Sequence, residues 1–373
     1  MEWSVLSSLA ALTSLGDRNE DDRKLFQRLS YYRAFYSSLP AEPRLVTRLD
    51  CSPTAASFLP GFLITPQTYK FFSPDQLLRA LLDRIEQHAL LERLGTFQFR
   101  PFFVAAVPFA YTSPFACLPP VHIEEALTAF ESAAALEGIY ECACLYYSDT
   151  DALATTLLRE RGYLSAKLEV NAVLKIDPSW RCIDDYFASR RHGKKERKEW
   201  KTFNSEQYSC IWHDGLNDKL IGTAVELECN LLKRKKVDVD EKELYAWFHA
   251  VRDRLTTDHL LLEVCDQLGA TVATLTFLRD GKALIGKAIG LAPERINSLY
   301  FCAAYYEPIR FCIENNYALI DYGPSAGAAK KFRGATPLPL YGAFRFAEDH
   351  PALPLWSEIA VALEQYFAQL WQP

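Results

Sequence analysis

The pattern of apolar and polar residues predicts alternating helices and strands in the first half of the chain. Residues 73–95 repeat apolar positions at helical spacing, and Ser73 followed by Pro74 is a helix-start signal. Apolar runs without a helical stripe predict strands, although Pro101 and Pro108 favour an edge or a bulge where they occur. The predicted helices are 23–38, 73–95, 121–138 and 149–163, and the predicted strands are 97–111, 139–147 and 166–176.

The second half is predicted to form a strand meander followed by a helix and one more strand. In "ATVATLTFLRDGKALIGKAIG", two strands flank Asp280 and Gly281, which favour a hairpin turn because both positions tolerate positive φ. We interpret residues 296–303 as the third strand of this meander. The other predicted elements are helices at 240–257 and 304–317, a strand at 318–323 and a final amphipathic helix at 354–371.

The length of 373 residues is too great for one ordinary core and suits two lobes. Residues 177–205 form a bridge between the lobes, since this segment is helix-forming, strongly charged and poor in aliphatic residues. Each lobe has a strand, then a helix that ends in tyrosine, then another strand, which suggests that the lobes are related. The predicted fold is α/β (α+β), with lobes 1–176 and 177–373, each a mixed, mainly antiparallel sheet flanked by helices. The bridge helix at 177–205 opens the second lobe.

Composition excludes several classes of protein. Hydrophobic residues make up 49% of the chain, but no run of about 18 uncharged apolar residues could span a bilayer, so we expect no membrane insertion. Glu2 replaces the basic start of a secretion signal, which predicts a cytoplasmic protein. Ten cysteines are scattered through apolar stretches without a CxxC pair, and the histidines show no ligand spacing. We expect reduced core cysteines and no metal site.

Positive charge is clustered rather than general. The net charge of −6 argues against a protein that coats nucleic acid nonspecifically. Cations nevertheless gather at 190–201, 233–236 and 330–333, and acidic residues that follow the second cluster favour a surface loop there. Local binding of an anion therefore remains open at the first and third clusters.

The second lobe carries the most specific family resemblance. Its meander, the helix "YYEPIRFCIENN", the strand "LIDYG" and the loop that ends in "KKFRG" resemble Fem-type aminoacyltransferases, within a tandem of two lobes similar to GCN5-related N-acetyltransferases (GNAT). The bridge "IDDYFASRRHGKKERKEWKTF" resembles the segment that opens the second lobe in those enzymes. The resemblance implies an acyltransferase that moves an aminoacyl group from aminoacyl-tRNA to an amine-type acceptor, a cell-wall precursor or a natural-product intermediate.

The same resemblance implies a set of site residues. Lys330 and Lys331 match a loop lysine that lies near the donor, so one of them would stabilise the tetrahedral species or hold the terminal tRNA phosphate. Two solvated lysines at a helix start are the ordinary alternative. For a general base, the residues leave Asp321, Glu307 and Asp266 open. The candidate acceptor groove or stacking residues are Tyr305, Tyr306, Glu307, Tyr322 and Arg333, with Trp200 as a further stacking candidate; the candidate tRNA phosphate contacts are Arg190, Arg191, Lys194, Lys195, Arg197 and Lys198.

Two alternatives to a tRNA donor stay open. Acetyltransferases of the GNAT superfamily hold the pyrophosphate of coenzyme A on a glycine turn at a helix start, and neither 107–127 nor 299–312, the expected joints, contains glycine. A coenzyme A-dependent N-acyltransferase is therefore the second choice, with acyl-CoA as the donor and no cofactor kept bound in either case. The third choice is a non-catalytic lobe pair that binds a saccharide or cell-wall ligand. Cys302 or Cys312 as an acyl carrier is a minor alternative.

Overall fold

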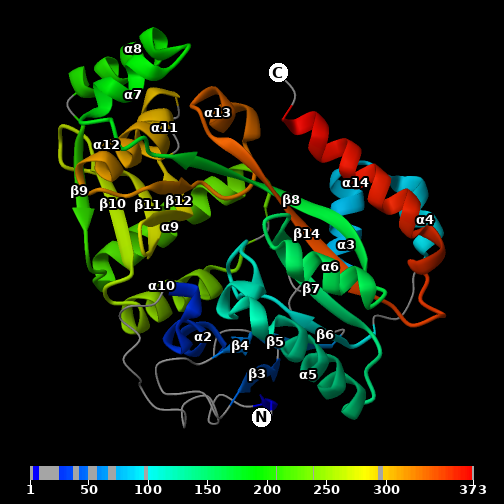
Figure 1. Ribbon diagram of the computed structural model, residues 1–373. Coiled ribbons are helices and arrows are strands. Elements are labelled where there is room, and N and C mark those ends of the chain that lie inside the picture. The colour runs from blue at the N-terminus through cyan, green and yellow to red at the C-terminus, as the bar shows by residue number, and fades with distance from the viewer. Residues whose placement is uncertain are drawn as a thin grey trace. The chain divides into compact units, whose positions relative to one another are not determined.

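The computed structural model describes residues 3–7, 25–36, 42–48, 57–65, 73–95, 100–206, 208–237, 239–292 and 297–371 (Figure 1). They form two compact units, one of residues 1–170 together with 338–373 and one of residues 171–337. The division after residue 170 lies close to the predicted one after residue 176. The predicted second lobe differs at its other end, because residues 338–373 pack with the first unit.

The first unit is built around a strand with both faces covered. All of β7 (Cys142–Ser148) is buried, and it runs parallel to β6 (Phe102–Ala105) and antiparallel to β14 (Thr336–Arg345). Phe130 of α5 (Ile123–Leu136) packs on Phe103, with ring centroids 4.8 Å apart. The sheet of this unit also contains β2 (Glu42–Pro43), β5 (Gly61–Ile64) and β8 (Leu164–Lys175), and a separate three-stranded sheet contains β1 (Trp3–Leu6), β3 (Leu45–Arg48) and β4 (Phe58–Leu59). The other helices are α2 (Leu29–Tyr36), α3 (Pro74–Arg84), α4 (His88–Leu94), α6 (Ala152–Glu160) and α14 (Trp356–Leu370), and β8 and β14 each continue into the second unit.

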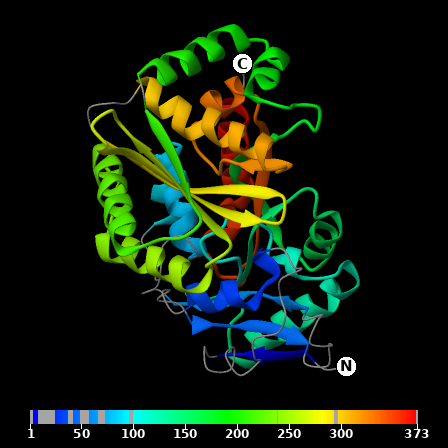
Figure 2. The same cartoon turned by 90° about the vertical axis from the view of Figure 1, so that its left-hand side faces the viewer.

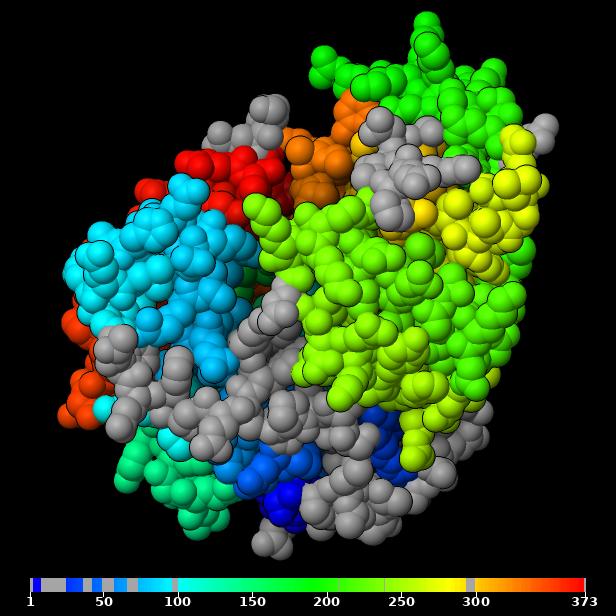
Figure 3. All heavy atoms as spheres, turned by 180° about the vertical axis from the view of Figure 1, so that it is seen from behind, coloured from blue at the N-terminus to red at the C-terminus, as the bar shows by residue number. Residues whose placement is uncertain are grey.

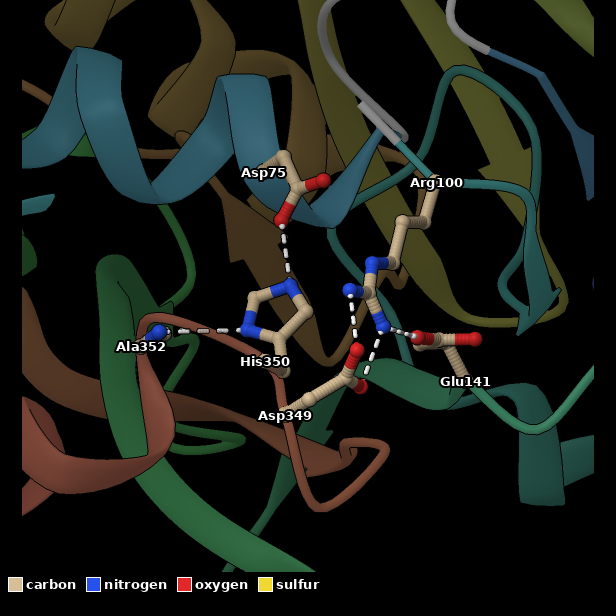
Figure 4. A network of polar contacts seen from close by, with 6 residues as sticks. All are labelled: Asp75, Arg100, Glu141, Asp349, His350 and Ala352. Atoms are coloured by element: carbon tan, nitrogen blue, oxygen red, sulfur yellow. Dashed lines mark hydrogen bonds and ion pairs between the residues drawn. The ribbon is translucent and has the colours of Figure 1, made fainter. Parts of the chain in front are cut away.

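A buried histidine fastens the C-terminal segment to this unit (Figure 4). The Nδ1 atom of His350 accepts a hydrogen bond from the backbone N–H of Ala352 at 3.2 Å, so the ring proton is on Nε2 and is donated to Asp75 at 3.2 Å. Beside it, Arg100 makes a bidentate pair with Asp349 at 2.7 and 2.8 Å, which lowers the pKa of Asp349 to about 2. These bonds connect the turn before α14 to the start of α3 and to β6, which explains why the chain's end belongs to the first unit.

The second unit holds a meander of antiparallel strands with one parallel neighbour. Its strand order is β8, β13 (Leu319–Asp321), β12 (Ala283–Leu291), β11 (Thr271–Asp280), β10 (His259–Cys265) and β9 (Ser209–His213), in which only β12 and β13 are parallel. The predicted hairpin between β11 and β12 is confirmed, with Gly281 at φ 61°. The fold class predicted from the sequence, mixed sheets flanked by helices, is likewise confirmed. The helices are α7 (Ile183–Ser189), α8 (Gly193–Ser205), α9 (Asp218–Arg234), α10 (Glu241–Arg254), α11 (Asn297–Phe301), α12 (Glu307–Glu314) and α13 (Gly327–Phe332), with a π-helical segment at Cys302–Tyr306.

The strand predicted at 296–303 is wrong. The described part of this run is α11 and the first residues of the π-helical segment, and the side chains of that segment are buried. A short apolar run such as 299–303 fits a strand and a buried helix equally well, so its pattern could not distinguish the two. The third strand of the meander is β10 instead, and β9 and α9 were also not predicted.

The strands of the second unit lie between α9 on one face and α11 and α12 on the other (Figure 2). The apolar side of α9 covers β12 and β11, and from behind α9 and α10 form a continuous outer surface (Figure 3). The packing is closest at Gly290 of β12, where a Cβ atom would lie 2.6 Å from Leu227 Cβ and 2.8 Å from the backbone nitrogen of Glu228.

This contact predicts that Gly290→Ala destabilises the protein, because the backbone of α9 cannot move out of the way of an added methyl group. We expect a loss of about 1–3 kcal/mol in the free energy of unfolding, the usual cost of overpacking. Urea unfolding followed by circular dichroism measures it. Gly215→Ala is the matched control, since nothing lies within 4 Å of that position; equal stability of the two variants would contradict the packing described here.

Candidate active site

The candidate site begins where two parallel strands separate. β12 pairs with β13 from Ala283 to Ile285, opposite Leu319 to Asp321, and the pairing described ends there. Just beyond, the register between β12 and β11 shifts, so that Lys287 is the extra residue of a β-bulge between Gly286 and Ala288. A bulge bends its strand and re-aims a side chain. The ends of β12 and β13 therefore present polar groups instead of a continuous ladder.

Three neighbouring strands contribute polar side chains at this point. Asn171 of β8 donates to Asp321 Oδ2 at 3.1 Å, and the backbone N–H of Gly323 donates to Oδ1 at 2.8 Å. Burial raises the pKa of Asp321, although the Gly323 N–H and the charges of Lys287 and Lys330 oppose the rise. Burial lowers the pKa of Lys287 to about 8, although Asp321 favours its charged form. We call Asn171, Lys287 and Asp321 the strand-end cluster.

The loop after β13 is held together by one lysine. The ammonium group of Lys330 donates to the carbonyl oxygens of Tyr322, Gly323 and Pro324 at 2.8, 2.9 and 2.7 Å. Lys330 is 6% exposed, and an ammonium has three N–H donors for these three acceptors. The next two loop residues, Ser325 and Ala326, have left-handed backbones. Lys330 thus fixes a tight loop, whereas the neighbouring Lys331 is exposed on α13.

Arg333 follows on α13 and is buried among aromatic rings. Its guanidinium carbon lies 3.9 Å from the ring centroid of Phe301 and 4.8 Å from that of Tyr305. Glu199 of α8 accepts from Arg333 at 3.2 Å and from the Tyr306 hydroxyl at 2.6 Å. Tyr305 and Tyr306 are both almost fully buried. The structure therefore places these two tyrosines and Arg333 in a packed interior and not on an open groove wall.

Tyr322 connects this interior to the loop. Its ring meets that of Tyr305 edge to face, with centroids 5.2 Å apart, and its backbone carbonyl is one of the three that bind Lys330. Burial keeps the pKa of its hydroxyl well above the ordinary value.

Some of the bridge cations bind other residues of the protein, and the others are exposed to solvent. Arg190 donates to the carbonyl of Phe332 at 3.0 Å, and Arg197 pairs with Asp184 at 2.8 Å. His192 stacks on Phe332 with centroids 4.7 Å apart, so the start of α8 is fixed to α13. The exposed cations of the bridge are Arg191, Lys194, Lys195 and Lys198.

One acidic residue near the bridge was not anticipated from the sequence. Glu196 of α8 is fully buried, and neither of its carboxylate oxygens has a hydrogen-bond partner in the described part of the chain. Burial raises its pKa, and the charges of Arg190 and Arg333 oppose the rise. The sequence does not reveal this, because a glutamate inside a charged run is usually solvated. Only the packing of α8 in the structure shows that Glu196 faces inward.

Other sequence-predicted candidates have structural roles in the geometry. Glu307 is 1% exposed and accepts from Trp212 at 2.8 Å and from Arg310 at 2.6 and 2.8 Å. Asp266 accepts from the backbone N–H groups of Leu268 and Ala270 in the turn between β10 and β11. Of the three base candidates, Asp321 is the one at the strand ends.

The thiols at Cys302 and Cys312 are fully buried, and burial raises the pKa of each far above its ordinary value. A buried, protonated thiol is a poor nucleophile, so the structure gives no support to either as an acyl carrier.

A surface pocket lies at the other end of β12 and β13. It has a volume of about 330 Å³ and is lined by Arg279, Gly281, Lys282, Phe311, Asn315, Asn316 and Tyr317. Arg279 already donates to the carbonyl of Thr257 at 2.9 Å and pairs with Asp214. The pocket is thus separate from the strand-end cluster.

The described residues contain neither a metal-binding cluster nor a membrane-spanning helix. No group of three or more His, Cys, Asp or Glu side chains in the part of the chain that the structure describes could hold a metal ion. None of the described helices is both long and apolar enough to cross a membrane.

Comparison with known proteins places this geometry in a family. The profile of the FemAB-like family, peptidoglycan biosynthesis/recognition, matches residues 87–362. The structure of FemX superposes with a TM-score of 0.59 at 12% identity, covering 96% of this chain and all of FemX. L-PGS from Bacillus licheniformis gives a TM-score of 0.51 at 13% identity and covers 78% of this chain and 96% of its own. These similarities show the fold. No curated protein matches the sequence.

The contrast between the two adjacent lysines is testable. Lys330→Met removes the donor of three carbonyl bonds, so we expect the free energy of unfolding to fall by roughly 3 kcal/mol, because each buried acceptor left without a donor costs about 1–3 kcal/mol. Lys331→Met changes an exposed side chain and should stay within about 0.5 kcal/mol of the unmodified protein. Chemical unfolding of the two variants side by side is the measurement. A Lys330→Met protein as stable as Lys331→Met would show that the carbonyl cage does not hold the loop.

Proposed function

Because the chain belongs to the FemAB-like family, we propose that it transfers an aminoacyl group from aminoacyl-tRNA to an amine-type acceptor, a cell-wall precursor or a natural-product intermediate. The family match points to an acyltransferase-type enzyme connected with peptidoglycan. The tRNA donor and the kind of acceptor go beyond the family match and are what we propose. The donor is consumed as a substrate, so no bound cofactor is required.

The exposed cations beside α13 carry the proposal. Lys194 and Lys198 are one helical turn apart on α8, and the stack of His192 on Phe332 fixes the start of this helix to the helix that bears Lys331. Exposed lysines and arginines on two joined helices suit the phosphates of a tRNA acceptor end, where counterion release favours binding. The net charge of −6 then limits nonspecific contacts elsewhere.

The chemistry at the strand ends fits acyl transfer to an amine. Attack of an amine on the ester carbonyl gives a tetrahedral oxyanion, which a preorganised cation stabilises more than it stabilises the substrate. Lys331 on α13 is our candidate for this task, since the ammonium of Lys330 is engaged by three carbonyls. The buried Arg333, Tyr305 and Tyr306 support α13 from beneath and so fix the direction of Lys331.

Coenzyme A is less well supported as the donor. The sequence between the end of β12 and the start of α11, residues 292–296, likewise contains no glycine. The nearest glycine, Gly290, packs against α9. A glycine turn at a helix start, the usual cradle for pyrophosphate, is therefore missing from this joint.

The proposal predicts transfer of a radiolabelled amino acid from charged tRNA to a peptidoglycan-precursor or amine acceptor, and ribonuclease treatment should abolish the product. Acetyl-CoA at millimolar concentration should leave the melting temperature unchanged, because a ligand that binds the folded protein raises it by mass action. Product formation that survives ribonuclease, or a clear rise with acetyl-CoA, would favour the coenzyme A donor. Saccharide binding without consumption of either donor would favour a binding protein.

Binding of tRNA should also weaken steeply with salt. Lys194→Ala and Lys198→Ala should each lower the slope of log affinity against log salt concentration by about 1, since each removes one phosphate contact. Lys242→Ala on α10, an exposed lysine of the same unit, is the control and should leave the slope unchanged. Equal slopes for all three variants would remove the phosphate-binding role of α8.

A further inference from the structure

The position of Lys287 is unusual for a lysine in a strand. It is the residue that the β-bulge inserts into β12, two positions after the pairing with β13 ends. Gly286 before it packs against the backbone of Asp321 and Tyr322, where a Cβ atom would lie 3.5 Å from the carbonyl oxygen of Asp321. The bulge therefore places Lys287 just past the last pair of β12 with β13, where the charge of Asp321 acts on it.

Lys287 is partly buried, and its surroundings are polar. Asp321 ends β13 and is itself held by Asn171 at 3.1 Å and by the Gly323 N–H at 2.8 Å, so its carboxylate cannot turn away. The charged groups that act at this point are Asp321 on β13 and Lys330 on α13, while Asn171 on β8 is polar and does not titrate. Lys330 is occupied by the loop carbonyls.

We propose that Lys287 is the general base of the transfer, with Asp321 as its positioning residue. The inference rests on the proposed function, since it assigns a role within that reaction. The bulge supplies the location, the fixed carboxylate supplies the orientation, and burial makes the neutral amine easier to form, because it lowers the pKa of Lys287 to about 8.

The proton movements balance without another reactant. The acceptor amine forms a bond to the ester carbonyl carbon, which gives an oxyanion and a positively charged nitrogen. The neutral Lys287 amine takes one proton from that nitrogen and becomes an ammonium, which the Asp321 carboxylate stabilises. The carbon–oxygen bond to the tRNA ribose then breaks, and the ribose oxygen takes the proton from Lys287. An amide and a free ribose hydroxyl result, and Lys287 is neutral again.

The first test is the titration of Lys287 in the whole, unmodified protein. Competitive labelling with acetic anhydride over a pH series, read by mass spectrometry, gives the midpoint for each lysine. We expect a midpoint near 8 for Lys287, well below the ordinary lysine value. Asp321→Asn should lower the Lys287 midpoint further, because it removes the negative charge that favours the ammonium. A Lys287 midpoint near 10 would overturn the assignment whether or not transfer is detected.

The second test is the pH profile of transfer. A base must be unprotonated, so kcat/KM should rise with pH up to about 8 and then level off, and Asp321→Asn should move this rise to lower pH. Lys287→Arg keeps the positive charge but cannot accept a proton, so it should lower kcat by about 10²–10⁴-fold and abolish the rise. Lys242→Arg is the control and should keep both rate and profile.

A lost activity can come from a failure to fold or from the loss of the base. Circular dichroism and melting temperature identify a variant that fails to fold, and the Asp321→Asn profile then decides alone. A folded Lys287→Arg protein with an unchanged rate and profile would exclude Lys287 as the base. If charged tRNA gives no product with any acceptor, the proposed function fails, while the labelling midpoints still show whether a base is built at this position.

Discussion

The early end of the pairing between β12 and β13 is the constraint on which the candidate site depends. Two parallel strands that stayed paired would satisfy each other's backbone groups and leave no place for polar side chains between their ends. Here the register holds from Ala283 to Ile285 and stops at a bulge. The chain must then find other partners for the backbone after Asp321. It finds them in the backbone of Ala172, in the side chain of Asp321 itself and in the ammonium of Lys330.

The buried charges beside this loop are costly, and their arrangement suggests what they provide. Arg333 and Glu199 have each lost most of their hydration, and a buried ion pair of this kind seldom adds net stability over apolar packing. The ion pair instead fixes the positions of the elements around it. The guanidinium lies on the rings of Phe301 and Tyr305 while Glu199 also accepts from Tyr306, so α13, α8 and the π-helical segment are joined at one point. An exposed side chain on α13 is therefore carried by a helix whose position is fixed.

Sequence patterns could predict the elements whose surroundings differ from one face to the other. The hairpin at Gly281, the helix at α5 and the two-lobe α/β fold all leave a periodic or turn signal, and the structure contains each of them. The run at 296–303 leaves no such signal because its apolar residues are consecutive from 299 to 303. The return of residues 338–373 to the first unit depends on long-range contacts such as that of His350 with Asp75, which no local pattern encodes.

The roles of the site residues were even harder to predict from local sequence. Family resemblance located the loop after β13, but the resemblance could not say which of its cations faces solvent. Lys287 was missed because a lysine in a strand is read as an outward residue, and the bulge that re-aims it is a property of pairing with β11. Asp321 was named among three possible bases, and its place at the strand end distinguishes it only once the register of β12, β13 and β8 is known.

The two adjacent lysines of "KKF" lie in different environments because of helix geometry. Successive residues of a helix point about 100° apart, so adjacent lysines on α13 cannot share one environment. Lys330 turns inward to three carbonyls and is 6% exposed, while Lys331 lies on the outer side. One cation is therefore used to shape the loop and the other is presented by it. A sequence motif records both as the same positive charge, and only the helix phase, fixed by Arg333 beneath it, assigns them different tasks.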